Sequence, residues 1–103
     1  MDDFSVERKS NLKRLVAIVQ GRVQGVGFRY FVVERATELN LVGTCRNLAN
    51  GDVEVVAEGE QGALEALLAA LHTGPRMARV EKVHAIWLPA TGEFTRFSVG
   101  PTR

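Results

Sequence analysis

The chain has 103 residues, of which 46% are hydrophobic and 24% charged, and its formal net charge is +1. These values are typical of one globular domain with its own core, and they argue against electrostatic attraction to nucleic acid or to an anionic membrane. The single cysteine, Cys45, excludes an internal disulfide and a multi-cysteine metal site and favours a reducing compartment. Because no apolar run approaches the ~20 residues of a membrane span and the N-terminus has no signal-peptide core, we expect a cytoplasmic protein.

The first elements are predicted from composition and from hydrophobic periodicity. Residues 1–12 are charged and polar, so we expect a disordered tail that precedes a single domain over residues 13–103. The run from Leu15 to Val19 is apolar and rich in β-branched residues, as in a central strand covered on both faces. Apolar residues then recur at helical spacing over 28–40, and Asn40 can end a helix in the left-handed conformation.

A hairpin is predicted next, with strands over 42–48 and 53–58. The intervening Asn50-Gly51 pair favours a two-residue type I′ turn, in which both residues have positive φ. On the returning strand Glu54 and Glu58 occupy alternate positions, and we interpret both as exposed sheet surface.

The remaining elements are a leucine-rich helix over 60–73 and strands over 80–88 and 94–99. The resulting order is β-α-β-β-α-β with one added strand. This order predicts a ferredoxin-like split βαβ sandwich, an α+β fold with two helices on one face of an antiparallel sheet. Since that fold supports many unrelated functions, the function has to be argued from a site.

The most informative segment is a glycine-rich turn between the first strand and the first helix. Its residues are Gly21, Arg22, Val23, Gln24, Gly25, Val26, Gly27 and Phe28. Unpaired N–H groups at a helix start, beside bare glycine backbone, form a cup for an anion. Arg29 follows at once, although a cation near a helix N-terminus is disfavoured by roughly 0.3–1 kcal/mol. A phosphate-like dianion between Arg29 and the helix start would explain this placement.

The segment 21–29, with the segments at 43–47, 50–54 and 74–80, resembles the acylphosphatase family over roughly residues 15–99. The resemblance implies hydrolysis of acyl phosphates to a carboxylate and inorganic phosphate, without a metal or a cofactor. It implies that Arg29 binds the phosphate, that Asn47 positions the attacking water, and that the turn 21–28 holds the phosphoryl oxygens. We therefore expect a small-molecule acyl phosphate substrate and a monomer that binds neither nucleic acid nor membrane.

The sequence departs from the family pattern at Thr44, where a tryptophan is usual. A non-catalytic anion-binding module on the same fold is the main alternative, and an RNA-binding sheet is disfavoured because the central strands lack aromatic residues. For Arg29 the alternative role is a surface ion pair with a carboxylate. Gln24 either faces solvent or orients the turn, and the sequence does not choose between the two.

Overall fold

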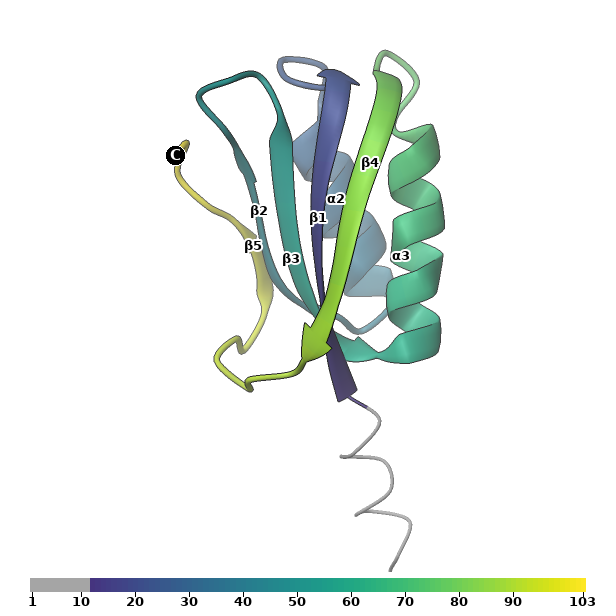
Figure 1. The fold of residues 1–103 in the computed structure, drawn as a ribbon, viewed down its shortest axis with the longest axis vertical. Coiled ribbons are helices and arrows are strands. Elements are labelled where there is room, and N and C mark those ends of the chain that lie inside the picture. The colour runs from purple at the N-terminus through teal and green to yellow at the C-terminus, as the bar shows by residue number, and fades with distance from the viewer. Residues whose placement is uncertain (1–11) are drawn as a thin grey trace, which may run out of the picture.

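The computed structural model describes residues 12–103 and confirms the predicted ferredoxin-like sandwich (Figure 1). Its elements are β1 (Leu12–Arg22), α2 (Phe28–Glu38), β2 (Val42–Asn47), β3 (Val53–Glu60), α3 (Gln61–Thr73), β4 (Arg79–Pro89) and β5 (Phe97–Val99). The expected N-terminal tail lies outside the described residues except for Leu12, which is the first residue of β1. The strands form one sheet in the order β4-β1-β3-β2-β5, and both helices cover the same face (Figure 1).

The sheet is mixed, whereas the sequence predicted an antiparallel one. The pairs β1–β3, β1–β4 and β2–β3 are antiparallel, but β5 runs parallel to β2. The chain leaves β4 at one edge of the sheet and crosses to the other edge at the same end of the molecule (Figure 1). Because β2 starts from that end too, β5 has to run in its direction.

The core lies between the sheet and the two helices. Alternate residues of the central strands point into it, as the period of a strand requires, and the helices contribute one stripe each. The fully buried side chains from β1 and β3 are Leu15, Ala17, Val19, Val53, Val55 and Ala57, and those from the helices include Val32, Ala36, Leu64, Leu67 and Leu71. Within residues 12–103, neither helix combines the length and the hydropathy needed to cross a membrane.

The two predicted turn signals have different outcomes. Asn40 ends the first helix with φ 59°, as its residue type suggested. The type I′ prediction for Asn50-Gly51 is wrong, because only Gly51, with φ 101°, has a positive φ there. The hairpin instead closes through Leu48, whose N–H donates to the Asp52 carbonyl over 2.8 Å. The Asn50 side-chain oxygen accepts the Asp52 N–H over 3.0 Å, which stabilises this local turn in place of the type I′ geometry.

The interpretation of Glu58 as exposed surface is also wrong. Its exposed fraction is 3%, since the connection from β4 to β5 folds over it. The carboxylate accepts the N–H groups of Thr91 and Gly92 over 2.9 and 3.0 Å, and the Arg14 Nε–H over 2.6 Å. Burial by itself raises the pKa of Glu58, but these bonds outweigh it and lower the pKa to about 2. Glu54, by contrast, stays partly exposed.

Candidate active site

The glycine-rich turn connects β1 to α2 and presents backbone to open space. Gly25 and Gly27 have φ 72° and 79°, a conformation that other residues rarely adopt, and a Cβ at either position would meet nothing within 4 Å. Val23 and Phe28 are buried in the core and fix the two ends of this open stretch. Between these two buried residues, Gly25 and Gly27 therefore leave the backbone of the turn open to solvent.

Among the described residues, 12–103, no side chain caps the start of α2. Gly27 is the N-cap residue, and the first turn of the helix contains no acidic residue. N–H groups in that position carry partial positive charge and can bind an anion. Left-handed glycines such as Gly25 and Gly27 before a helix are typical of backbone turns whose N–H groups can bind an anion.

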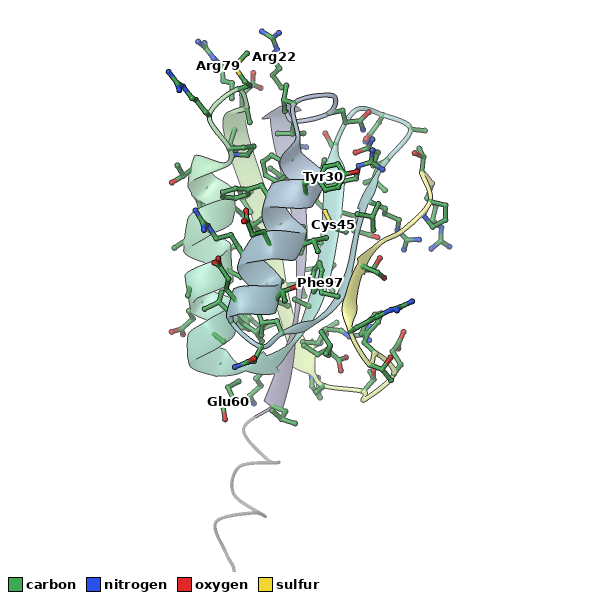
Figure 2. All side chains as sticks on the ribbon, turned by 180° about the vertical axis from the view of Figure 1, so that it is seen from behind. Arg22, Tyr30, Cys45, Glu60, Arg79 and Phe97 are labelled. Carbon is green, nitrogen blue, oxygen red and sulfur yellow. The ribbon has the colours of Figure 1, made fainter. Side chains whose placement is uncertain are left out.

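Gly21 and Arg22 differ from the rest of the turn because they still belong to β1. They pair with Val80 and Arg79 of β4, after a bulge at Gln20 and Gly21. A Cβ on Gly21 would overlap the Arg79 carbonyl oxygen, so only glycine allows β4 to pack this closely. The side chains of Arg22 and Arg79 are exposed and extend from the same end of the molecule (Figure 2).

Arg29 is the second residue of α2 and is half-buried. Burial raises the pKa of the Cys45 thiol to about 12, and the positive charge of Arg29 acts in the opposite direction. Figure 2 shows Cys45 beside α2. Within residues 12–103, Arg29 has no carboxylate at ion-pair distance, so the surface ion pair considered from the sequence is disfavoured.

Asn47 is the last residue of β2 and lies two positions after Cys45, on the same face of the sheet. Its side-chain oxygen Oδ1 is buried and accepts no hydrogen bond from any described residue. Leaving a buried acceptor unsatisfied costs about 1–3 kcal/mol. Such a group is typical of a site that is completed by a ligand or a water molecule.

Gln24 joins the turn to the hairpin that carries Asn47. Its Nε2 donates to the Leu48 and Asp52 carbonyl oxygens, each over 2.8 Å. The sequence left open whether Gln24 faces solvent or orients the turn. These two hydrogen bonds favour the second role. The sequence offers no signal for these bonds, because both acceptors are backbone groups that any residue supplies.

Thr44 lies away from this site. It precedes Cys45 and pairs with Val56 and Ser98, so it faces the opposite side of the sheet from Asn47. The departure from the family pattern therefore leaves the turn, Arg29 and Asn47 unchanged. In the part of the chain from residue 12 onward, no three His, Cys, Asp or Glu side chains gather as a metal site would require.

A family model described as Acylphosphatase matches residues 15–99. The chain belongs to the acylphosphatase family. An acylphosphatase of Thermus thermophilus is 57% identical over 76 residues, which are 74% of this chain and 86% of the relative. An acylphosphatase of Salinibacter ruber is 49% identical over 87 residues, 84% of this chain and 92% of the relative.

Solved structures agree with this assignment. The crystal structure of the acylphosphatase from Bacillus subtilis superposes with a TM-score of 0.83 at 36% sequence identity, covering 85% of this chain and 98% of that one. The family resemblance and the enzyme class predicted from the sequence, a hydrolase acting on acid anhydrides, are confirmed. The non-catalytic alternative is not favoured, since the matched relatives are acylphosphatases over most of their length.

Proposed function

We propose that this acylphosphatase binds the phosphoryl group of its substrate between the turn 21–28 and Arg29, and that Asn47 positions the attacking water. The observation that carries the proposal is that three groups suited to a phosphate or a water lack partners among residues 12–103. The start of α2 has no side-chain cap, Arg29 has no ion pair, and the buried Asn47 Oδ1 accepts no hydrogen bond. A buried polar group such as Asn47 Oδ1 is usually hydrogen-bonded in a folded protein, and its lack of a partner is typical of a ligand site.

The chemistry needs few groups because an acyl phosphate is already activated. Its leaving group is a carboxylate with a pKa near ~4, so no general acid has to protonate it. Phosphoryl transfer then depends on positioning and on stabilising the charge of the phosphoryl oxygens. The planar guanidinium of Arg29 can donate to two of these oxygens, which a lysine ammonium does not match, and the turn amides donate to the others.

In the reacting complex, the oxygen of a water attacks phosphorus while the bond to the acyl oxygen breaks and the carboxylate leaves. Asn47 can accept a hydrogen bond from that water at Oδ1, which orients the water oxygen toward phosphorus. An amide is too weak a base to remove the proton, so we assign it to a phosphoryl oxygen of the substrate. With no titrating side chain in the step, we expect a rate that is nearly constant across neutral pH.

The test is phosphate release from benzoyl phosphate in the presence of a chelator, for the wild type, Arg29→Ala and Asn47→Ala. We expect metal-independent turnover that both substitutions abolish while circular dichroism shows an intact fold. A folded wild type that binds inorganic phosphate without turnover would instead support the anion-binding module. Turnover that needs added metal would contradict the metal-free mechanism.

We also propose a cytoplasmic monomer whose single domain spans residues 13–103. The burial of Cys45 supports a thiol that stays reduced and takes no part in cross-linking. Sedimentation equilibrium of the purified chain, with and without a reducing agent, tests the monomer directly, and a dimer under both conditions would contradict it.

A further inference from the structure

We propose that Gln24 is a positioning residue: its side-chain amide fixes the distance between the phosphate-binding turn and Asn47. This inference rests on the proposed function, because it assigns the turn to phosphate and Asn47 to the water. The placement matters because an error of about 1 Å between reacting groups can cost on the order of 10²-fold in rate.

The contacts lie where the two halves of the site meet. Gln24 Nε2 donates both of its hydrogens, one to the Leu48 carbonyl and one to the Asp52 carbonyl, at 2.8 Å each. Leu48 directly follows Asn47, and Asp52 directly precedes Val53, the residue that pairs with Asn47 across the hairpin. One side chain from the turn is thus bonded to both ends of the hairpin loop, next to the Asn47–Val53 pair.

The hairpin does not need Gln24 in order to close. The Leu48 N–H donates to the Asp52 carbonyl over 2.8 Å, and the Gly51 N–H donates to the Leu48 carbonyl over 3.1 Å. Each carbonyl that Gln24 contacts therefore already accepts a backbone hydrogen bond. Since a carbonyl oxygen has two lone pairs, the bonds from Gln24 add a link between elements and do not rescue an unsatisfied group.

The hairpin is also held from its other side. The Arg103 N–H donates to the Asn47 carbonyl over 3.0 Å, and the Ala49 N–H donates to the Arg103 carbonyl over 2.8 Å. These bonds fix the hairpin to the C-terminal segment but not to the phosphate-binding turn. Within residues 12–103, the Gln24 amide supplies the side-chain hydrogen bonds that cross from the turn to the hairpin.

Gln24→Met tests this role, because methionine keeps the length of the side chain and removes both donors. We expect kcat for benzoyl phosphate to fall by about 10- to 100-fold. Inhibition by inorganic phosphate should change little, because the turn amides and Arg29 remain. Gln61→Met is the matched control: Gln61 is exposed at the start of α3, at the end of the molecule away from the turn, and should keep wild-type kcat (Figure 1).

Gln24→Glu gives a second readout that a merely structural role would not move. An ionised glutamate faces two carbonyl oxygens with no donor, whereas the protonated acid restores one hydrogen bond. We expect kcat of this variant to rise as the pH falls below neutrality, while the wild-type rate and that of Gln61→Glu stay nearly constant.

An unchanged kcat in Gln24→Met, or a loss of phosphate affinity as large as the loss of kcat, would overturn the positioning role. A pH profile of Gln24→Glu parallel to that of Gln61→Glu would do the same. Failure of the proposed function is separate, because it appears in the wild type as absent turnover, before any Gln24 variant is compared.

Discussion

Glu58 and Asn47, on neighbouring strands, each have a buried side-chain oxygen, but only Glu58 has partners for it among residues 12–103. The carboxylate of Glu58 in β3 accepts hydrogen bonds from the N–H groups of Thr91 and Gly92 and from Arg14. The positive charge of Arg14 also balances its negative charge. Asn47 of β2 has a buried Oδ1 that accepts nothing from residues 12–103. The two lie near opposite ends of the paired strands, since β2 pairs with β3 from Val42↔Glu58 to Asn47↔Val53.

This difference distinguishes a buried group that stabilises the fold from one that is available to a substrate. A buried polar group with its partners inside the protein contributes to the folded state, because removing it leaves those partners unsatisfied. A buried polar group without partners costs free energy in the empty protein, and that cost is recovered only when substrate or water completes it. Substitutions at the Glu58 end should therefore change the free energy of unfolding, and substitutions at the Asn47 end should change the rate.

The largest effect is expected for Arg29→Ala. We expect kcat/KM for benzoyl phosphate to fall by about 10³-fold or more, as when an arginine that stabilises a transferring phosphoryl group is lost. The free energy of unfolding should stay unchanged or rise by up to about 1 kcal/mol, because a cation leaves the start of α2. Steady-state kinetics and urea unfolding measure the two quantities.

Arg35→Ala is the control on the same helix, because Arg35 is exposed and pairs with Glu38 one turn further along. It should keep the wild-type rate. An Arg29→Ala protein with wild-type turnover would contradict the assignment of this end of the molecule to phosphate.

Asn47→Ala should lower kcat by about 10²–10³-fold, the usual effect of removing one positioned polar group from a phosphoryl- or acyl-transfer site. The free energy of unfolding should stay unchanged or rise by up to about 1–3 kcal/mol, because alanine removes a buried oxygen that accepts no hydrogen bond from the described residues. Asn50→Ala, in the same hairpin, should leave kcat unchanged. A marked loss of stability in Asn47→Ala with little loss of rate would show that Asn47 stabilises the fold and does not serve the reaction.

Glu58→Gln should have the opposite profile. We expect the free energy of unfolding to fall by about 1.5–3 kcal/mol, because hydrogen bonds to a charged group are replaced by weaker bonds and Arg14 loses its partner. The rate of the folded protein should be unchanged. Chemical unfolding of this variant and of Glu54→Gln, a partly exposed glutamate on the same strand, measures the contrast.

The smallest effect is expected on acidification. The pKa of Glu58 is lowered to about 2 in the folded protein, so its contribution is fully present above the unfolded value of 4.5. That contribution is lost as the pH falls from 4.5 toward 2, because the unfolded state binds the proton first. The stability difference between the wild type and Glu58→Gln should therefore shrink over this window. A difference that stays constant down to pH 2 would contradict the lowered pKa.

The predictions from sequence succeeded where the signal was local. Asn40 adopts positive φ, and the glycine-rich turn enters a helix at Phe28, because both features depend on residues adjacent in the chain. The type I′ turn failed because the Asn50 side chain bonds to Asp52 and selects another conformation. A residue pair favours a turn type but does not settle it when a neighbouring side chain competes.

The interpretation of Glu58 failed for a different reason. Alternation along β3 correctly put it on the sheet face that the helices leave open, but that face is covered locally by the connection from β4 to β5. The sequence between residues 58 and 91 gives no indication of this contact. The sequence identified Gln24 as part of the turn but could not predict its hydrogen bonds, because the acceptors are backbone groups 24 and 28 positions away.

By itself, the sequence determined the order of the elements, the backbone shape of the glycine-rich turn and the family to which the chain belongs. The order of the elements and the shape of the turn follow from residue type and short-range spacing, which fix φ, helix starts and strand periodicity. The family follows from the resemblance of the sequence motifs. Only the tertiary structure decided which polar groups have partners. That outcome depends on whether segments far apart in the chain come within hydrogen-bond distance of each other. Glu58 is therefore buried with its partners, whereas the Asn47 oxygen has no partner among residues 12–103.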